Sequence, residues 1–185
     1  EPLTDVAALL EQFPEVKAVC IATPTQYHKA VAEQLLPRGV ACLIEKPLAP
    51  SVTEARTLVE LANRYDTLLQ VGHTERFNPA IRAVANLKMP ARFIEVDRVS
   101  PMTFRSLDVG VVMDMMIHDL DIVLMLANSP IGKVDAAGVA VLGQHEDIAS
   151  ARITFQSGCV ANLTASRIAM KTDRKMRLFS EEGYV

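Results

Sequence analysis

Several features that would place this 185-residue chain in a special class of protein are missing from it. Its 19 basic and 22 acidic residues give a formal net charge of −3, whereas a nucleic-acid-binding domain is normally clearly basic. There is no run of about 18 apolar residues that could span a membrane, and no basic start followed by an apolar stretch as in a signal peptide. The sequence therefore predicts a globular protein with no nucleic-acid or membrane partner.

Cysteine is also scarce. Cys20, Cys42 and Cys159 form an odd, widely spaced set, which argues against a disulfide framework and against a CxxC metal pair. The most common role of such a cysteine is that of a small buried hydrophobe, and a reducing, cytoplasmic location is the simplest prediction. What the chain does contain, 50% hydrophobic and 22% charged residues, is an ordinary globular balance.

The first 72 residues alternate between short apolar runs and segments with helical spacing. Such runs are typical of strands buried on both faces of a parallel sheet, and Ser51 with Glu54 forms a capping box at the start of one helix. The order is typical of a βαβαβ unit with right-handed crossovers. The predicted elements are strand 16–22, helix 25–36, strand 40–44, helix 51–65 and strand 67–72.

The pattern changes after Gly72. Asn78 and Pro79 are an N-cap and a first helical residue, and a longer apolar helix follows a single strand. Consecutive strands after an α/β unit predict a second, α+β domain, so we expect domains at 1–72 and 73–185. The predicted elements are helix 78–87, strand 92–99, helix 108–126, and strands 134–142, 148–155, 160–168 and 175–179.

Two polar clusters follow neighbouring strands of the predicted sheet. Thr23, Pro24 and His28 come after the first strand, and Glu45-Lys46-Pro47 comes after the second. Ligands of doubly wound sheets bind at the carboxyl ends of the strands, so these clusters should lie side by side. Lys46 could hold a hydroxyl or a ribose, or act as a base if burial lowers its pKa. The alternative is a surface lysine at the edge of the sheet.

The long helix carries a carboxylate and an imidazole. Asp114 and His118 are four residues apart and should share a helix face, an arrangement that suits a general base for an alcohol proton. A buried core histidine with its partner is the alternative. A metal site with Asp119 and Asp121 is less favoured, because Asp119 points about 100° away from His118 on a helix.

A third cluster lies where the first domain meets the second. Arg76 and Asn78 fall at this junction, and interdomain junctions favour ligand clefts. The fork of Arg76 could bind a phosphate or carboxylate of a substrate, or form a structural ion pair. Arg98 and Arg105 could line the same cleft or be solvated.

Three motifs together resemble the Gfo/Idh/MocA family, which includes glucose-fructose oxidoreductase and inositol dehydrogenase. They are Ala22-Thr23-Pro24-x-x-x-His28, Glu45-Lys46-Pro47-Leu48-Ala49 and Asp114-x-x-x-His118-Asp119, in this order and spacing. The resemblance implies an NAD(P)-binding Rossmann domain followed by an α+β domain whose open, mostly antiparallel sheet makes a homo-oligomer. It also implies oxidoreduction of a sugar or polyol.

The resemblance also implies roles for individual residues. Thr23, Pro24 and His28 would lie near the nicotinamide, and Glu45 and Lys46 would contact its ribose and the substrate. The Lys46–Pro47 bond is expected to be cis. Asp114 and His118 would be the acid–base pair beside the reacting carbon.

A narrower similarity concerns the segments 72–79 and 116–121. They are similar to those of the family's UDP-N-acetylglucosamine 3-dehydrogenases, which would give the arginines Arg76, Arg98 and Arg105 a diphosphate to bind.

One motif of the family is not in this sequence. The eight glycines include no GxGxxG, so the βαβαβ unit is predicted to be the second half of a Rossmann domain and the chain a fragment. NAD and NADP cannot be told apart, and we expect this chain alone to bind dinucleotide weakly and to be inactive. A non-catalytic nucleotide-sugar-binding or assembly subunit, and a metal-dependent hydrolase, are the alternatives to a dehydrogenase.

Overall fold

The chain folds as two units, Glu1–Gly72 and His73–Val185. The structure is a computed structural model, and it describes residues 3–103 and 109–185. Each unit has a hydrophobic core of its own. None of the helices in the described ranges is long and apolar enough to cross a membrane.

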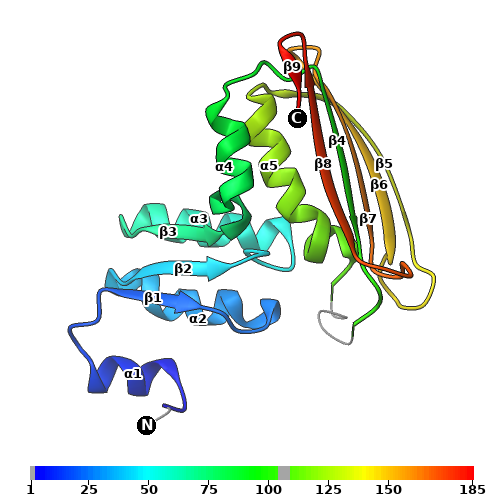
Figure 1. The fold of residues 1–185 in the computed structure, drawn as a ribbon. Helices are drawn as coiled ribbons and strands as arrows, with labels where there is room; N and C mark the ends of the chain where they lie inside the picture. Colours follow the sequence, from blue (N-terminus) through cyan, green and yellow to red (C-terminus); the bar gives the residue numbers. More distant parts are fainter. Residues whose placement is uncertain (1–2, 104–108) are drawn as a thin grey trace. The chain divides into compact units, whose positions relative to one another are not determined.

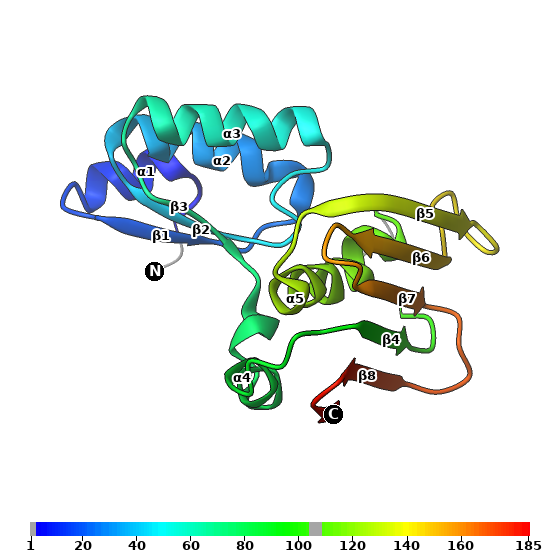
Figure 2. The ribbon, with the colours of Figure 1, turned by 90° about the horizontal axis from the view of Figure 1, so that it is seen from above.

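The first unit is a three-stranded parallel sheet with its connecting helices on one face (Figure 2). The strands are hydrogen-bonded in the order β1-β2-β3, and helices α2 and α3 connect them. The elements are α1 (Val6–Gln12), β1 (Ala18–Ile21), η1 (Thr25–Tyr27), α2 (His28–Leu35), η2 (Leu36–Arg38), β2 (Ala41–Glu45), α3 (Val52–Arg64) and β3 (Leu69–Gly72).

The core of this unit lies between the sheet and the helices. Along β2, Cys42 and Ile44 are buried against the helices, whereas Leu43 between them is 39% exposed on the opposite face. Parallel sheets are normally covered on both faces, and here the described chain covers one. Helix α3 begins where its sequence predicts, because the Ser51 hydroxyl accepts a hydrogen bond from the Glu54 amide at 3.2 Å.

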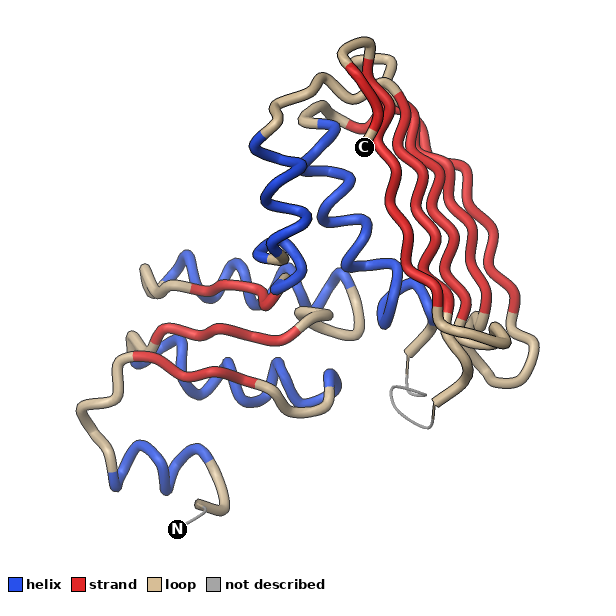
Figure 3. Tube along the Cα trace, viewed as in Figure 1, coloured by secondary structure: helices blue, strands red, loops and turns tan. Residues whose placement is uncertain are grey.

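The second unit places its helices on one side of a single sheet (Figures 1 and 3). As predicted, Asn78 caps the first α-helix, with Pro79 at its first position. The long predicted helix begins as a π-helical segment, in which the backbone bonds span five residues. The helical elements are η3 (Thr74–Phe77), α4 (Pro79–Asn86), the π segment η4 (Val112–Met116) and α5 (Ile117–Ala127).

The sheet of the second unit has the strand order β5-β6-β7-β4-β8-β9. Four of the five pairings are antiparallel, and β4 with β7 is parallel, which agrees with the predicted open, mostly antiparallel sheet. Side chains alternate, so that Ile94 and Val96 face the helices while Glu95 and Asp97 face the other side. The strands are β4 (Phe93–Val99), β5 (Ile131–Val139), β6 (Ile148–Phe155), β7 (Val160–Ser166), β8 (Asp173–Ser180) and β9 (Gly183–Tyr184).

The predicted strand 134–142 differs from the observed β5, which begins at Ile131 and ends at Val139. Its end has a local cause. The carboxylate of Asp147 accepts hydrogen bonds from the amides of Val141 and Leu142 at 2.8 and 2.7 Å, which turns these residues away from strand pairing.

Candidate functional site

The first group of candidate residues lies at the carboxyl ends of β1 and β2. Thr23 and Pro24 follow β1 and are exposed, and Glu45 ends β2, with the half-buried Lys46 after it. Because the two strands pair in parallel, their carboxyl ends share one edge of the sheet (Figure 1). This is the edge where open α/β sheets bind their ligands.

His28 links the two segments at this edge. Its side chain is 1% exposed, with Nδ1 3.0 Å from the carbonyl oxygen of Pro47 and Nε2 2.8 Å from that of Thr23. Both partners are acceptors, and a neutral ring donates to the one that faces its N–H, so the tautomer decides which oxygen receives the hydrogen bond. The observed contacts of His28 are thus with the backbone, and its predicted place near a nicotinamide stays a prediction.

The edge continues onto β3. Glu45 pairs with Gly72, and a Cβ added to Gly72 would lie 3.3 Å from the Glu45 carboxylate. The absence of a side chain at Gly72 therefore lets the Glu45 carboxylate lie against the end of β3. The Lys46–Pro47 peptide bond is cis, which confirms the expectation from the family resemblance.

The second group of candidate residues lies on the helix of the second unit. Asp114 belongs to the π segment η4, and His118 to the first turn of α5, and both are half-buried. A π-helix has more residues per turn than an α-helix, and the π segment ends only at Met116. The α-helical spacing that predicts a shared face for Asp114 and His118 therefore does not apply to this part of the helix. The pairing of Asp114 with His118, and their meeting with Lys46 of the first unit, stay predictions.

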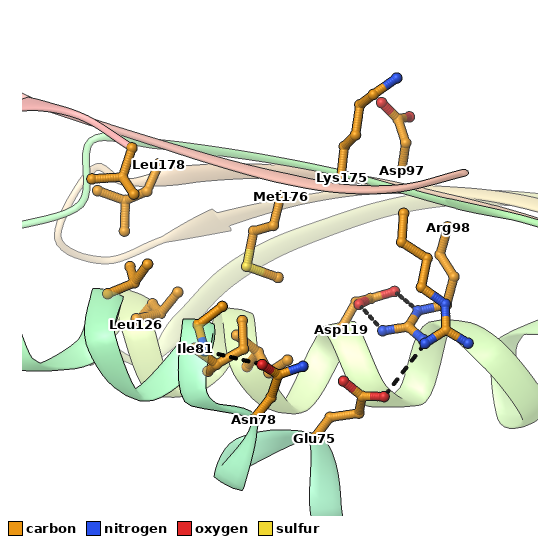
Figure 4. A pocket seen from close by; sticks show the side chains of 15 residues that line it. Glu75, Asn78, Ile81, Asp97, Arg98, Asp119, Leu126, Lys175, Met176 and Leu178 are labelled. Carbon is orange, nitrogen blue, oxygen red and sulfur yellow. Dashed lines mark hydrogen bonds and ion pairs between the residues drawn. The ribbon is translucent and has the colours of Figure 1, made fainter. Parts of the chain in front are cut away.

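Arg98 and Asp119 form a buried, two-bonded ion pair. Nε and Nη2 of Arg98 each lie 2.7 Å from an Asp119 oxygen, and the two residues are 6% and 4% exposed. Burial by itself would lower the pKa of Arg98, but the hydrogen bonds and charge of Asp119, together with the charge of Glu75, more than offset it, so this pKa is raised. The pair connects β4 to α5 (Figure 4).

Arg76 of η3 and Asp121 of α5 form a second, more exposed pair. Nε and Nη2 of Arg76 lie 2.5 and 2.8 Å from the Asp121 carboxylate oxygens. This hydrogen bonding raises the pKa of Arg76. The structural ion pair considered from the sequence is therefore present, and binding of a substrate by Arg76 stays a prediction.

A cavity of about 360 Å³ lies between the helices and the sheet of this unit (Figure 4). Glu75 and the Arg98–Asp119 pair lie at its polar end, and Leu126 and Leu178 at its apolar end, with Asn78 between them. Neither Asp114 nor His118 lines this cavity, so it is separate from the proposed acid–base pair. Arg105, the fourth residue predicted to bind substrate, lies outside the described residues.

The start of the helix is held by neighbouring acidic residues that the sequence analysis did not single out. The carbonyl and carboxylate oxygens of Glu146 accept hydrogen bonds from the amides of Val111 and Val112, at 2.9 and 3.2 Å. Arg167 bonds to Asp147 and to the carbonyl oxygen of Val109, each at 2.8 Å. These contacts fix the backbone just before Asp114.

Sequence reasoning also missed the structural use of Asp119. The sequence does show acidic residues after His118, at Asp119 and Asp121, but they were interpreted only as possible metal ligands. Both Asp119 and Asp121 are instead engaged by arginines. Within residues 3–103 and 109–185, no group of three or more potential ligands could hold a metal ion.

Two family models match the chain. Residues 1–73 match "Oxidoreductase family, NAD-binding Rossmann fold", and residues 85–185 match "GFO/IDH/MocA C-terminal domain". The chain belongs to the Gfo/Idh/MocA family of oxidoreductases.

Similar proteins include a nucleotide-sugar dehydrogenase and an inositol dehydrogenase. The chain is 43% identical, over 92% of its length, to UDP-N-acetylglucosamine 3-dehydrogenase of Acidithiobacillus ferrooxidans, and covers 55% of that protein. It is 27% identical, over 95% of its length, to inositol 2-dehydrogenase of Rhizobium meliloti, and covers 58% of it. The chain thus spans little more than half the length of these relatives.

A solved structure of the Acidithiobacillus enzyme supports the family assignment. It superimposes on this chain with a TM-score of 0.90 and 42% identity, covering 100% of this chain and 60% of the enzyme. The described helices and strands are therefore those of a Gfo/Idh/MocA oxidoreductase.

Proposed function

We propose that the protein carrying this chain is an NAD(P)-dependent dehydrogenase that oxidises a hydroxyl group of a sugar or nucleotide sugar, with UDP-N-acetylglucosamine as the first substrate to test. The observation that carries this proposal is the 43% identity to a UDP-N-acetylglucosamine 3-dehydrogenase over 92% of the chain. Family membership supports the reaction class and the nicotinamide cofactor.

The residues at the edge of the first sheet fit the nicotinamide end of such a cofactor. Thr23 and Pro24 are exposed where β1 ends, and Glu45 lies against Gly72 beside Lys46. Phosphate binding in a Rossmann domain is the task of a glycine-rich turn at a helix N-terminus, and the sequence holds no such motif. We therefore expect weak dinucleotide binding and no turnover from residues 1–185 alone.

In the proposed reaction the protein supplies the base and the orientation. A bound nicotinamide would supply the hydride acceptor for the sugar carbon. His118 takes the proton of the substrate hydroxyl, Asp114 holds the imidazole in its reactive orientation, and the ammonium of Lys46 holds the substrate oxygen. Asn78, Arg76 and Arg105 are the proposed contacts to the rest of the substrate, whereas the fork of Arg98, the fourth predicted contact, is bonded to Asp119.

Substitution of the two central residues tests the proposal. In a protein of the relatives' full length that contains this chain, Lys46→Ala and His118→Ala should each lower turnover about 10²-fold or more, the scale of a positioned acid–base group. Turnover is measured as the rate of NADH or NADPH formation, with UDP-N-acetylglucosamine and with inositol as substrates. Lys17→Ala and His145→Ala, at exposed positions, are matched controls.

Near-normal turnover of both variants would contradict these roles. An unmodified protein that binds the nucleotide sugar without oxidising it would favour the alternative, a non-catalytic subunit of the same fold. The uncovered face of the β5–β9 sheet is the proposed surface for a homo-oligomer in either case, since the helices of the unit lie on the other face (Figure 3).

A further inference from the structure

The Arg98–Asp119 ion pair holds the helix at the residue next to His118, the proposed base. Asp119 directly follows His118, and both lie in the regular α-helix that begins at Ile117. Successive residues of an α-helix point about 100° apart. The direction of the Asp119 side chain therefore sets the direction of His118 around the helix axis.

The geometry of the pair allows little rotation of the helix. A guanidinium and a carboxylate joined by two parallel hydrogen bonds must stay nearly coplanar, and both bonds here are 2.7 Å long. Arg98 is itself held in β4, which pairs with β7 on one side and β8 on the other. Turning the helix would separate two buried charges, which is strongly disfavoured.

We propose that Asp119, through its pair with Arg98, is a positioning residue that fixes the orientation of His118 for proton transfer. This proposal rests on the proposed function, in which His118 is the base. It also gives Arg98 a role different from that of a substrate ligand. The pair differs in burial from the Arg92–Glu181 pair, whose side chains are 59% and 74% exposed.

The double variant Arg98→Met/Asp119→Leu separates positioning from stability. Replacing a buried ion pair by apolar side chains of similar size is often neutral or stabilising, so the variant should melt at the same or a higher temperature. The rotational constraint on the helix is nevertheless lost. Arg92→Met/Glu181→Leu is the matched control.

The first measurement needs no activity. In residues 1–185 labelled with ¹⁵N, the imidazole signals of His118 should shift or broaden in the double variant and stay unchanged in the control. Unchanged His118 signals in a folded double variant would overturn the proposal, even if the unmodified full-length protein oxidises no sugar and the proposed function itself fails.

The second measurement is turnover by the full-length protein. We expect kcat to fall about 10- to 10²-fold with KM for the sugar unchanged, because a small misplacement of a reacting group has effects of this size. A higher KM with normal kcat would identify Arg98 as a substrate ligand instead, and overturn the proposal. If the double variant does not fold, Arg98→Lys keeps the charge without the fork, and normal kcat in that variant would overturn it.

Discussion

The link that His28 makes between two backbone segments can be measured by removing it. The substitution His28→Leu fills the site with an apolar side chain of similar size and removes both ring nitrogens. The carbonyl oxygens of Pro47 and Thr23, now 3.0 and 2.8 Å from the ring, would lose their partner. The first of these hydrogen bonds is buried and the second is partly buried.

The size of the effect follows from how the two oxygens are placed. A buried acceptor that loses its donor costs about 1–3 kcal/mol, which is the cost at Pro47 in the tautomer whose hydrogen is on Nδ1. The partly buried Thr23 oxygen can recover a hydrogen bond from water, so its loss adds little. We therefore expect the free energy of opening of the first unit to fall by about 1–3 kcal/mol, roughly a 5- to 150-fold rise in its opening constant.

Hydrogen exchange followed by mass spectrometry can locate this loss. Peptides from β1 and β2 should exchange faster in the His28→Leu chain, while peptides from β6 and β7, which belong to the other unit, should not change. His145→Leu makes the same substitution at an exposed position and should leave both sets unchanged. Unaltered protection of β1 and β2 in His28→Leu would refute the inference that the ring holds the two segments together.

Two further predictions concern acid stability and thiol reactivity. The amide of Leu142, followed by the side chain of Arg167, holds the pKa of Asp147 far below its ordinary value; the stability this provides is present above about pH 4 and should be lost as the pH falls below it. The urea midpoint of unfolding should therefore fall less steeply below about pH 4 in Asp147→Asn than in the unmodified chain. An equally steep fall in both would show that Asp147 does not cause the loss of stability in acid. Burial raises the pKa of Cys42 to about 11 and raises that of Cys159, so iodoacetamide at about pH 8 should label the exposed Cys20 first. Intact mass should show this label vanish in Cys20→Ser, and equal labelling of that variant would be contrary to the structure.

The local structure of this protein could be predicted because short segments carry its signals. Alternating apolar runs and helical spacing indicate the βαβαβ order, and the caps at Ser51 and Asn78 act within three residues of the chain. The candidate residues Thr23, Lys46 and His118 were found by the same short motifs. Chemistry at the end of a strand or on one helix turn is visible in a sequence because it depends on near neighbours.

The partners of the charged residues were decided only by the tertiary structure. Arg98 meets Asp119 across 21 residues, and Arg76 meets Asp121 across 45. The parallel pairing of β4 with β7 joins strands more than 60 residues apart along the chain, and it places Arg98 over the helix. A sequence shows that an arginine is present, but whether its fork faces a substrate or a carboxylate depends on which strand folds beside which helix, and that is settled by burial of the whole core.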